Sequence, residues 1–166
     1  MKVSDATILA IPGHAPLEPG HWLERWTGRL STALPVPAAQ GNDDPLHRLI
    51  AEAPGPVVAL AYREGIERLL AHADALPVTG AFLVAPLENS GVAERIEPLP
   101  FPSILVASRD DPLCPFERAE DMGASWGSLF VDAGEAGELD AASGRGPWPE
   151  GLMVLAKFMG RLEPVA

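Results

Sequence analysis

The chain contains a single cysteine, Cys114, among its 166 residues. It therefore cannot form an internal disulfide framework, and we expect it to reside in a reducing, cytoplasmic environment. Cys114 lies between Leu113 and Pro115, and no histidine is nearby in the sequence. We interpret it as a small buried packing residue and not as a catalytic thiol.

Long hydrophobic runs are also missing. No apolar segment approaches the roughly 18 residues that a membrane-spanning helix requires. The N-terminal segment Met1–Asp5 lacks the apolar core of a signal peptide. We therefore expect a soluble intracellular protein with no membrane partner.

Basic residues are few. The chain has 12 lysines and arginines against 23 acidic residues, which gives a net charge of −11. This balance disfavours binding to nucleic acid or to an anionic membrane surface. The length and the hydrophobic share of 47% predict one globular domain spanning residues 1–166.

Prolines and glycines divide the chain into short segments in which strand and helix patterns alternate. The strand candidates are the apolar runs Thr7–Ile11, Leu34–Ala39, Val57–Ala61, Gly80–Ala85, Ser103–Ser108 and Leu129–Val131. The helix candidates are Pro19–Ser31, Asp43–Ala53, Glu64–Ala75, Phe116–Trp126 and Pro149–Leu162. This alternation predicts an α/β fold with a mostly parallel sheet covered by helices on both faces.

The segment Tyr62–Gly65 follows a predicted buried strand and precedes a predicted helix. An α/β-hydrolase places its nucleophilic serine on a sharp turn in this strand–turn–helix context. The central residue here is Arg63, and a guanidinium cannot accept an acyl group.

Three further loops leave the carboxyl ends of predicted strands, where parallel α/β sheets gather functional groups. They are Pro12–His14, Ser108–Pro112 and Ala133–Trp148, and their order matches the oxyanion, acid and histidine loops of an α/β-hydrolase. The residues that we expect to line a pocket are Gly13, His14, Tyr62, Glu64 and Trp148.

Three groups of residues carry a specific family resemblance. They are Pro12-Gly13 with Gly20-His21-Trp22 and Trp26, the acid-loop segment Pro100–Pro112, and the tail Ala141–Gly151. In this order they resemble the small lidless serine hydrolases that include retinoblastoma-binding protein nine and its bacterial relatives. The resemblance covers nearly the whole chain. It implies a single-domain three-layer sandwich without a lid domain, with no cofactor and no metal.

The resemblance also assigns positions to a catalytic triad. The family's acid falls on Asp111 and is retained. Where the family has small-His-Ser-Leu-Gly, this chain has Arg63 in the place of serine, and where the family has Ala-Gly-His-Ile-Asn, Glu138 replaces the histidine. The resemblance therefore implies a serine hydrolase relative with a degenerate triad.

No other side chain is a convincing substitute. Ser90, Ser108 and Ser143 lie in loops where hydroxyls usually satisfy backbone groups. Of the histidines, His14 alone is near the expected pocket, and we interpret it as structural or solvated.

Several roles for the substituted positions remain open. We favour a salt-bridge cluster of Arg63, Asp111 and Glu138 that closes the site; alternatively, Arg63 binds the carboxylate or phosphate of a small anionic ligand. A metal site on carboxylates is disfavoured because Arg63 would repel the cation. A glycosidase-like carboxylate pair, Asp111 with Glu138, is disfavoured because Arg63 would keep both ionised. The carboxylates considered for a metal are Asp111, Glu135, Glu138 and Asp140.

Two functional hypotheses follow. The first is a non-catalytic binding or interaction module, which recognises a small anionic ligand or a protein. The alternative is an active hydrolase of small esters or amides that uses a non-standard nucleophile or base, and it is supported by fold resemblance alone.

Overall fold

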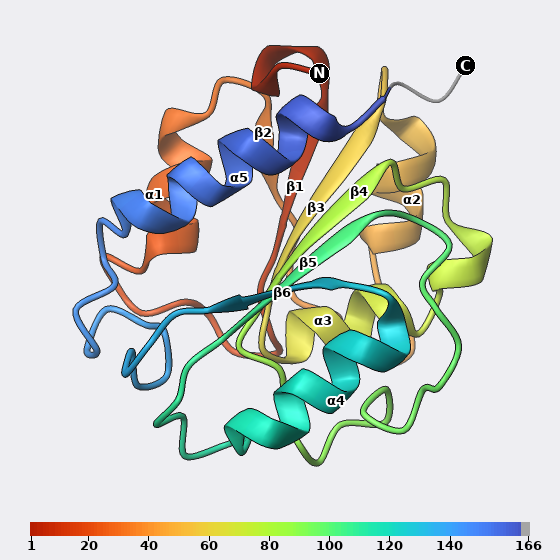
Figure 1. Cartoon of the computed structure of the whole chain (residues 1–166). Helices are drawn as coiled ribbons and strands as arrows, with labels where there is room; N and C mark the ends of the chain where they lie inside the picture. The colour runs from red at the N-terminus through yellow and green to blue at the C-terminus, as the bar shows by residue number, and fades with distance from the viewer. Residues whose placement is uncertain (164–166) are drawn as a thin grey trace.

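A six-stranded parallel sheet forms the centre of the computed structural model, which describes residues 1–163 (Figure 1). The strand order is β2-β1-β3-β4-β5-β6, and each neighbouring pair is parallel. The strands are β1 (Thr7–Ile11), β2 (Ala33–Pro35), β3 (Val57–Tyr62), β4 (Gly80–Val84), β5 (Ser103–Ala107) and β6 (Leu129–Asp132).

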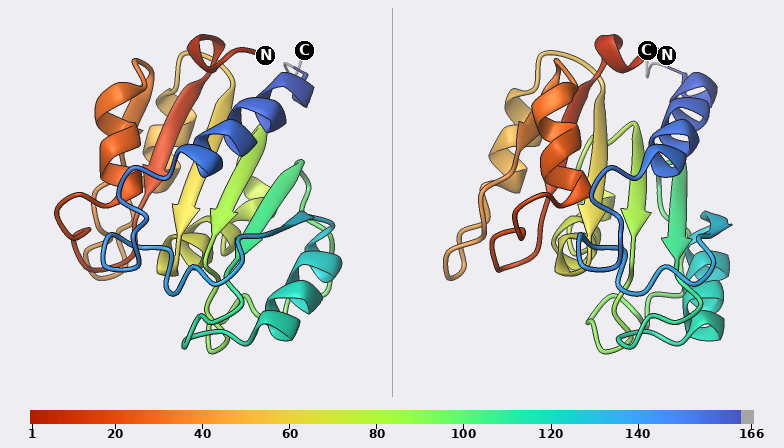
Figure 2. Two further views of the ribbon diagram at one scale, coloured as in Figure 1. Left: turned by 60° about the vertical axis from the view of Figure 1, so that its left-hand side comes forward. Right: turned by 90° about the vertical axis from the view of Figure 1, so that its left-hand side faces the viewer.

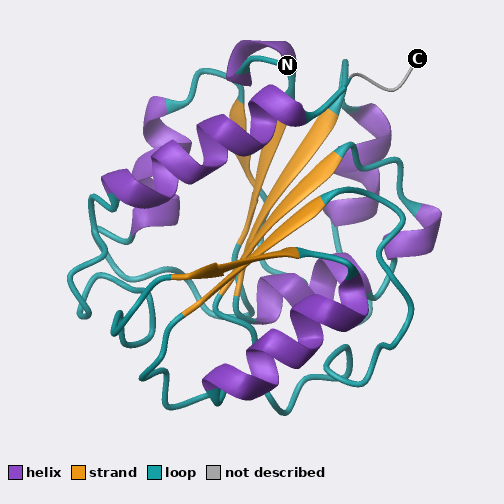
Figure 3. Cartoon of the chain, in the orientation of Figure 1, coloured by secondary structure: helices purple, strands orange, loops and turns teal. Residues whose placement is uncertain are grey.

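Helices cover both faces of this sheet (Figure 3). They are α1 (Trp22–Arg29), α2 (Leu46–Glu52), α3 (Glu64–Leu70), α4 (Phe116–Trp126) and α5 (Pro149–Arg161), with short 3-10 helices η1 (Val3–Asp5) and η2 (Ala73–Ala75). Helices α1 and α5 pack on one face, and α2, α3 and α4 pack on the other. The three-layer α/β sandwich expected from the sequence is therefore confirmed.

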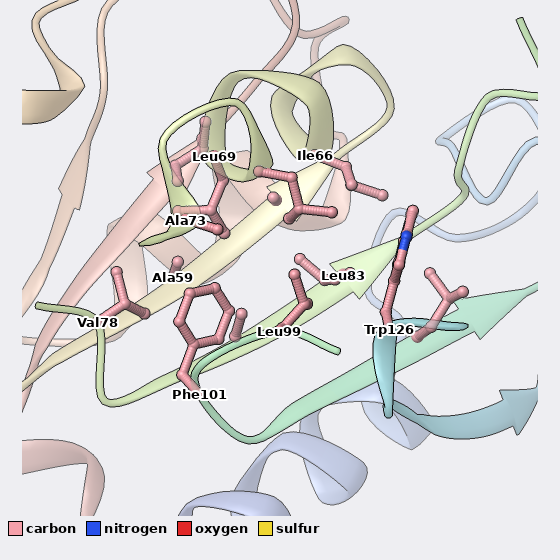
Figure 4. Close-up of a cluster of buried hydrophobic side chains, with 14 of the residues drawn as sticks. Ala59, Ile66, Leu69, Ala73, Val78, Leu83, Leu99, Phe101 and Trp126 are labelled. Atoms are coloured by element: carbon pink, nitrogen blue, oxygen red, sulfur yellow. The ribbon is translucent and has the colours of Figure 1, made fainter. Parts of the chain in front are cut away.

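The continuous apolar strands are explained by burial on both faces. Along β1, Leu9 and Ile11 contribute to the core beneath α2, α3 and α4, while Ile8 and Ala10 contribute to the core beneath α1 and α5. Figure 4 shows part of the first of these cores, where Ile66 of α3 and Trp126 of α4 pack over the sheet.

Several predicted boundaries were wrong, two of them for identifiable reasons. Helix α1 begins at Trp22 and not at Pro19, because Gly20 has a φ of 82° and the His21 side chain caps the helix. Strand β2 ends at Pro35 and does not reach Ala39, because prolines supply no N–H to a sheet ladder. The predicted helix to Ala75 ends at Leu70 and is followed by η2.

The strand order reverses direction between β1 and β3. After β1 the chain moves outward to the edge strand β2 and then returns to β3 on the other side of β1. The loops after β1 and β3 therefore diverge at a topological switch point, which is where open α/β sheets bind ligands. The strands' carboxyl ends lie together, opposite the chain termini (Figure 2).

Among residues 1–163, no helix is long and apolar enough to cross a bilayer. The same residues form no separate lid domain. The predicted domain extends to residue 166, and its last three residues lie outside the described part.

Candidate functional site

The turn between β3 and α3 has the backbone of a nucleophile elbow. Arg63, its central residue, has φ 54° and ψ −122°, a conformation that is strained for a side chain of this size. Gly65 lets the first turn of α3 approach β1 closely, since a Cβ there would collide with the Ile11 carbonyl oxygen. The turn is thus held in place by a contact that only glycine permits.

Arg63 forms a bidentate ion pair with Asp111, which follows β5. Its Nη1 donates to Asp111 Oδ2 at 2.7 Å, and its Nη2 donates to Asp111 Oδ1 at 3.0 Å. Both side chains are buried. Burial disfavours the charged guanidinium, but the hydrogen bonds and charge of Asp111 outweigh this effect and raise the pKa of Arg63.

Glu138 completes the cluster from the loop that follows β6. Nη2 of Arg63 also donates to Glu138 Oε1 at 3.2 Å, and the Glu138 side chain is 43% exposed. The Tyr62 hydroxyl donates to the Glu138 carbonyl at 2.7 Å and anchors this loop to the end of β3. Arg63, Asp111 and Glu138 therefore meet in one ion cluster, as the first interpretation of Arg63 predicts.

The residues expected to line a pocket do not all lie together. Gly13, Tyr62 and Glu64 border a cavity of about 240 Å³ at the switch point. Trp148 borders a different cavity of about 510 Å³ between β6 and the start of α5. His14 is exposed and lines neither of them. The order of the loops in the sequence predicts that they all lie at one end of the sheet, but it does not predict which cavity each side chain borders.

Glu64 occupies the gap between the elbow and the loop after β1. A Cβ at Gly13 would collide with Glu64 Oε2, so the carboxylate lies directly against the Gly13 backbone. In a hydrolase, backbone N–H groups from these two segments form the oxyanion hole. A negative charge therefore lies beside the position where such an enzyme would stabilise one.

His21 also borders the switch-point cavity, and the sequence analysis did not select it. Its Nδ1 accepts a hydrogen bond from the Leu23 N–H at 3.1 Å. Burial lowers its pKa to about 4, against the opposing effect of Glu18 and Asp140. His21 is therefore neutral near pH 7. The Gly20-His21-Trp22 segment was the only sequence feature that pointed to His21. A helical pattern over Pro19–Ser31 does not show that His21 caps the helix and faces a cavity.

The candidate alternative nucleophiles have structural roles. Ser108 Oγ donates to Asp110 and accepts from the Ala136 N–H, and Ser90 Oγ donates to the Leu87 carbonyl. Ser143 Oγ donates to Asp140 and accepts from the Glu138 N–H. None of these hydroxyls is hydrogen-bonded to a histidine in residues 1–163.

Cys114 is buried as expected, and burial raises the pKa of its thiol to about 11. The thiol is therefore neutral near pH 7 and a poor nucleophile. The carboxylates considered for a metal do not converge either: across the described range, no three potential ligands gather in one place.

Comparisons with known proteins agree with this architecture. Residues 8–157 match the model of the serine hydrolase family. A YdeN-like protein of Pectobacterium atrosepticum has a TM-score of 0.84 and 27% identity, over 95% of this chain and 93% of that one. The ydeN gene product of Bacillus subtilis has a TM-score of 0.70 and 16% identity, over 94% and 98%. An esterase domain of Rhodothermus marinus also has a TM-score of 0.70 and 16% identity, over 97% and 88%.

A shorter match concerns a different kind of enzyme. Over 84 residues the chain is 39% identical to trans-aconitate 2-methyltransferase of Streptomyces coelicolor. This match covers 50% of the chain and only 25% of that protein, so it assigns no methyl transfer. The family match, in contrast, extends from β1 into α5. The chain belongs to the serine hydrolase family.

Proposed function

We propose that this chain is a serine hydrolase family member without serine hydrolase chemistry, and that it acts as a binding or interaction module. Its motifs are those of the retinoblastoma-binding protein nine-like group, with Arg63 replacing the serine and Glu138 the histidine. The observation that carries the proposal is the engagement of both terminal nitrogens of Arg63 by Asp111 and Glu138.

The substitutions remove the covalent route. Arg63 offers no acyl acceptor, and Asp111, which would orient a histidine, is hydrogen-bonded to the guanidinium instead. In a serine protease, loss of the nucleophile or of the base lowers turnover by about a millionfold. Glu64 adds a further obstacle, because a carboxylate against Gly13 opposes the negative charge of a tetrahedral intermediate.

The switch-point cavity is the proposed binding site. Glu18, Glu64 and Asp140 border it, and its lining includes no lysine or arginine. Since the charge of Arg63 is already neutralised, these groups favour a cationic occupant over the anionic ligand expected from the sequence. The occupant would be a small amine or guanidine, or a basic side chain of a partner protein.

Activity-based labelling tests the proposal. We expect no reaction of the folded protein with a fluorophosphonate probe, and no hydrolysis of p-nitrophenyl acetate above the buffer rate. Arg63→Ala is the matched control, because it removes the ion cluster without supplying a nucleophile. Labelling of any serine in the native protein, absent after heat denaturation, would overturn the proposal and favour the alternative of an active hydrolase of small esters or amides.

A further inference from the structure

The two helices on one face of the sheet differ in charge from the rest of the chain. Helices α1 and α5 together hold four lysines and arginines and two acidic residues. The helices on the opposite face, α2, α3 and α4, hold three arginines and six acidic residues. In a chain with a net charge of −11, basic residues therefore outnumber acidic ones on the helices of one face alone.

The four basic side chains of these helices are exposed and have no acidic partner. They are Arg25 and Arg29 of α1, and Lys157 and Arg161 of α5. None of them forms an ion pair with a carboxylate within residues 1–163, whereas five other arginines do. The helix dipole favours a cation in the last turn, which accounts for Arg29 and Arg161 but not for Arg25 and Lys157.

Exposed apolar side chains accompany these charges. Leu152 of α5 is 37% exposed, and the adjacent Met153 is 62% exposed. Met153 precedes Lys157 and Arg161 at four-residue spacing, so the three side chains share one side of the helix. Leu152 borders a small depression of about 60 Å³ between α5 and α1, whose other lining residues are Arg25, Trp26, Arg29, Leu30 and Pro147 (Figure 1). The outer face of α1 and α5 thus combines apolar side chains with unpaired cations.

These charges select the kind of partner that fits. A second copy docked through the same face with two-fold symmetry would place basic side chains against basic side chains, which is repulsive. An anionic membrane would meet only two exposed large apolar side chains here, a small area for insertion. An acidic protein segment can instead pair with the cations, and the negative charge on the remainder of the chain is screened beyond about 10 Å at 0.1 M salt.

We propose that the outer face of α1 and α5 binds an acidic amphipathic helix of a partner protein. The carboxylates of that helix pair with the four cations, and its apolar side chains lie against Leu152 and Met153. Helix α5 has 13 residues and spans about 20 Å, which matches about four turns of a partner helix. None of these residues borders the switch-point cavity, so this inference does not depend on the binding proposed there.

A synthetic peptide tests the proposal. The probe is a fluorescein-labelled helical peptide of glutamate and leucine, about 14 residues long, with its leucines on one side. We expect saturable binding by fluorescence anisotropy, which weakens as sodium chloride is raised because the ion pairs are exposed. A peptide with lysine in the place of glutamate should not bind. A peptide with serine in the place of leucine should bind at least about tenfold more weakly, since it lacks the apolar contact.

Charge reversal supplies the matched variants. R25E/R29E/K157E should bind the glutamate peptide at least about tenfold more weakly and should bind the lysine peptide instead. R48E reverses an exposed arginine on α2, on the other face of the sheet, and should bind as the native protein does. Far-UV circular dichroism reports folding, and the milder R25Q/R29Q/K157Q, with the same expected loss, serves if the reversed variant unfolds.

Two further measurements distinguish the other possible occupants of this face. Analytical ultracentrifugation detects self-association, and sedimentation with phosphatidylserine vesicles detects membrane binding. We expect a monomer that stays in the supernatant. Self-association or vesicle binding that R25E/R29E/K157E abolishes would overturn the proposal in favour of a second copy or a membrane. Absence of binding to the glutamate peptide, or equal binding by the native protein and R25E/R29E/K157E, would also overturn it.

Discussion

Arg63 and Asp111 face each other across the end of β4, with Arg63 following β3 and Asp111 following β5. Their two hydrogen bonds, of 2.7 and 3.0 Å, join residues 48 positions apart. The pair resembles the fork geometry in which arginine binds a carboxylate most specifically. It occupies the centre of the candidate site.

Breaking this pair should destabilise the protein strongly. Asp111→Asn leaves a buried guanidinium with only a partly exposed carboxylate partner, so we expect a loss of about 3–5 kcal/mol in the free energy of unfolding. Glu138→Gln should lose at most about 1 kcal/mol, because the Glu138 side chain is 43% exposed and solvent screens its ion pair. Urea unfolding near neutral pH compares the two. Equal losses in the free energy of unfolding for the two variants would show that the burial of Asp111 does not make its ion pair stronger than that of Glu138.

Restoring catalysis should require three substitutions. R63S/E138H rebuilds the missing nucleophile and base around Asp111, but it leaves the Glu64 carboxylate against Gly13. Adding Glu64→Leu, the residue found in the family motif, should raise p-nitrophenyl acetate hydrolysis by about a hundredfold, the scale of an oxyanion-hole contribution. Asp111→Asn in the triple variant is the control and should abolish the gain. A double variant as active as the triple would show that Glu64 does not obstruct the site.

Stability should fall as pH is lowered through the titration range of His21. Its folded-state pKa of about 4 lies below the ordinary 6.5, so the unfolded chain binds more protons between these values. We expect a loss of roughly 2 kcal/mol between about pH 7 and about pH 5.

Suitable variants isolate this effect. His21→Asn keeps a side chain able to cap α1 but does not titrate, so it should flatten the pH dependence, whereas the exposed His14→Asn should not. The hydrogen bond from Arg68 lowers the pKa of Asp44, and that from Arg109 lowers the pKa of Asp132. Their stabilisation is lost only below the ordinary aspartate pKa of 3.8, outside this window. If the free energy of unfolding of His21→Asn depends on pH as steeply as that of the native protein, His21 is not the cause of the pH dependence.

Two glycines should respond in opposite directions to alanine. Gly65→Ala forces the start of α3 away from β1, because its Cβ collides with the Ile11 carbonyl, and should destabilise the fold by about 1–3 kcal/mol. Gly160→Ala lies in α5 with no atom near its Cβ and should stabilise it by roughly 0.5–1 kcal/mol. Thermal unfolding of both variants provides the measurement, and destabilisation by both would refute the packing argument.

The sequence predicted most of the fold because its signals are local. Continuous apolar runs ended by proline or glycine indicate strands buried on both faces, and α4 was predicted at its observed bounds, Phe116–Trp126. Predicted helix and strand ends were wrong where the backbone conformation of a single residue sets the end, as Gly20 does before α1. Motif order likewise sufficed to predict that Arg63, Asp111 and Glu138 lie close together.

The contacts made by those residues were decided by tertiary structure alone. Sequence spacing could not show whether Arg63 pairs with both carboxylates or remains free for an anion, because the outcome depends on loops brought together by three different strands. It also could not show that Glu64 lies against Gly13 or that His21 is buried and neutral. Local patterns specify helices and strands, whereas burial and pairing of polar groups depend on neighbours that are distant in the chain.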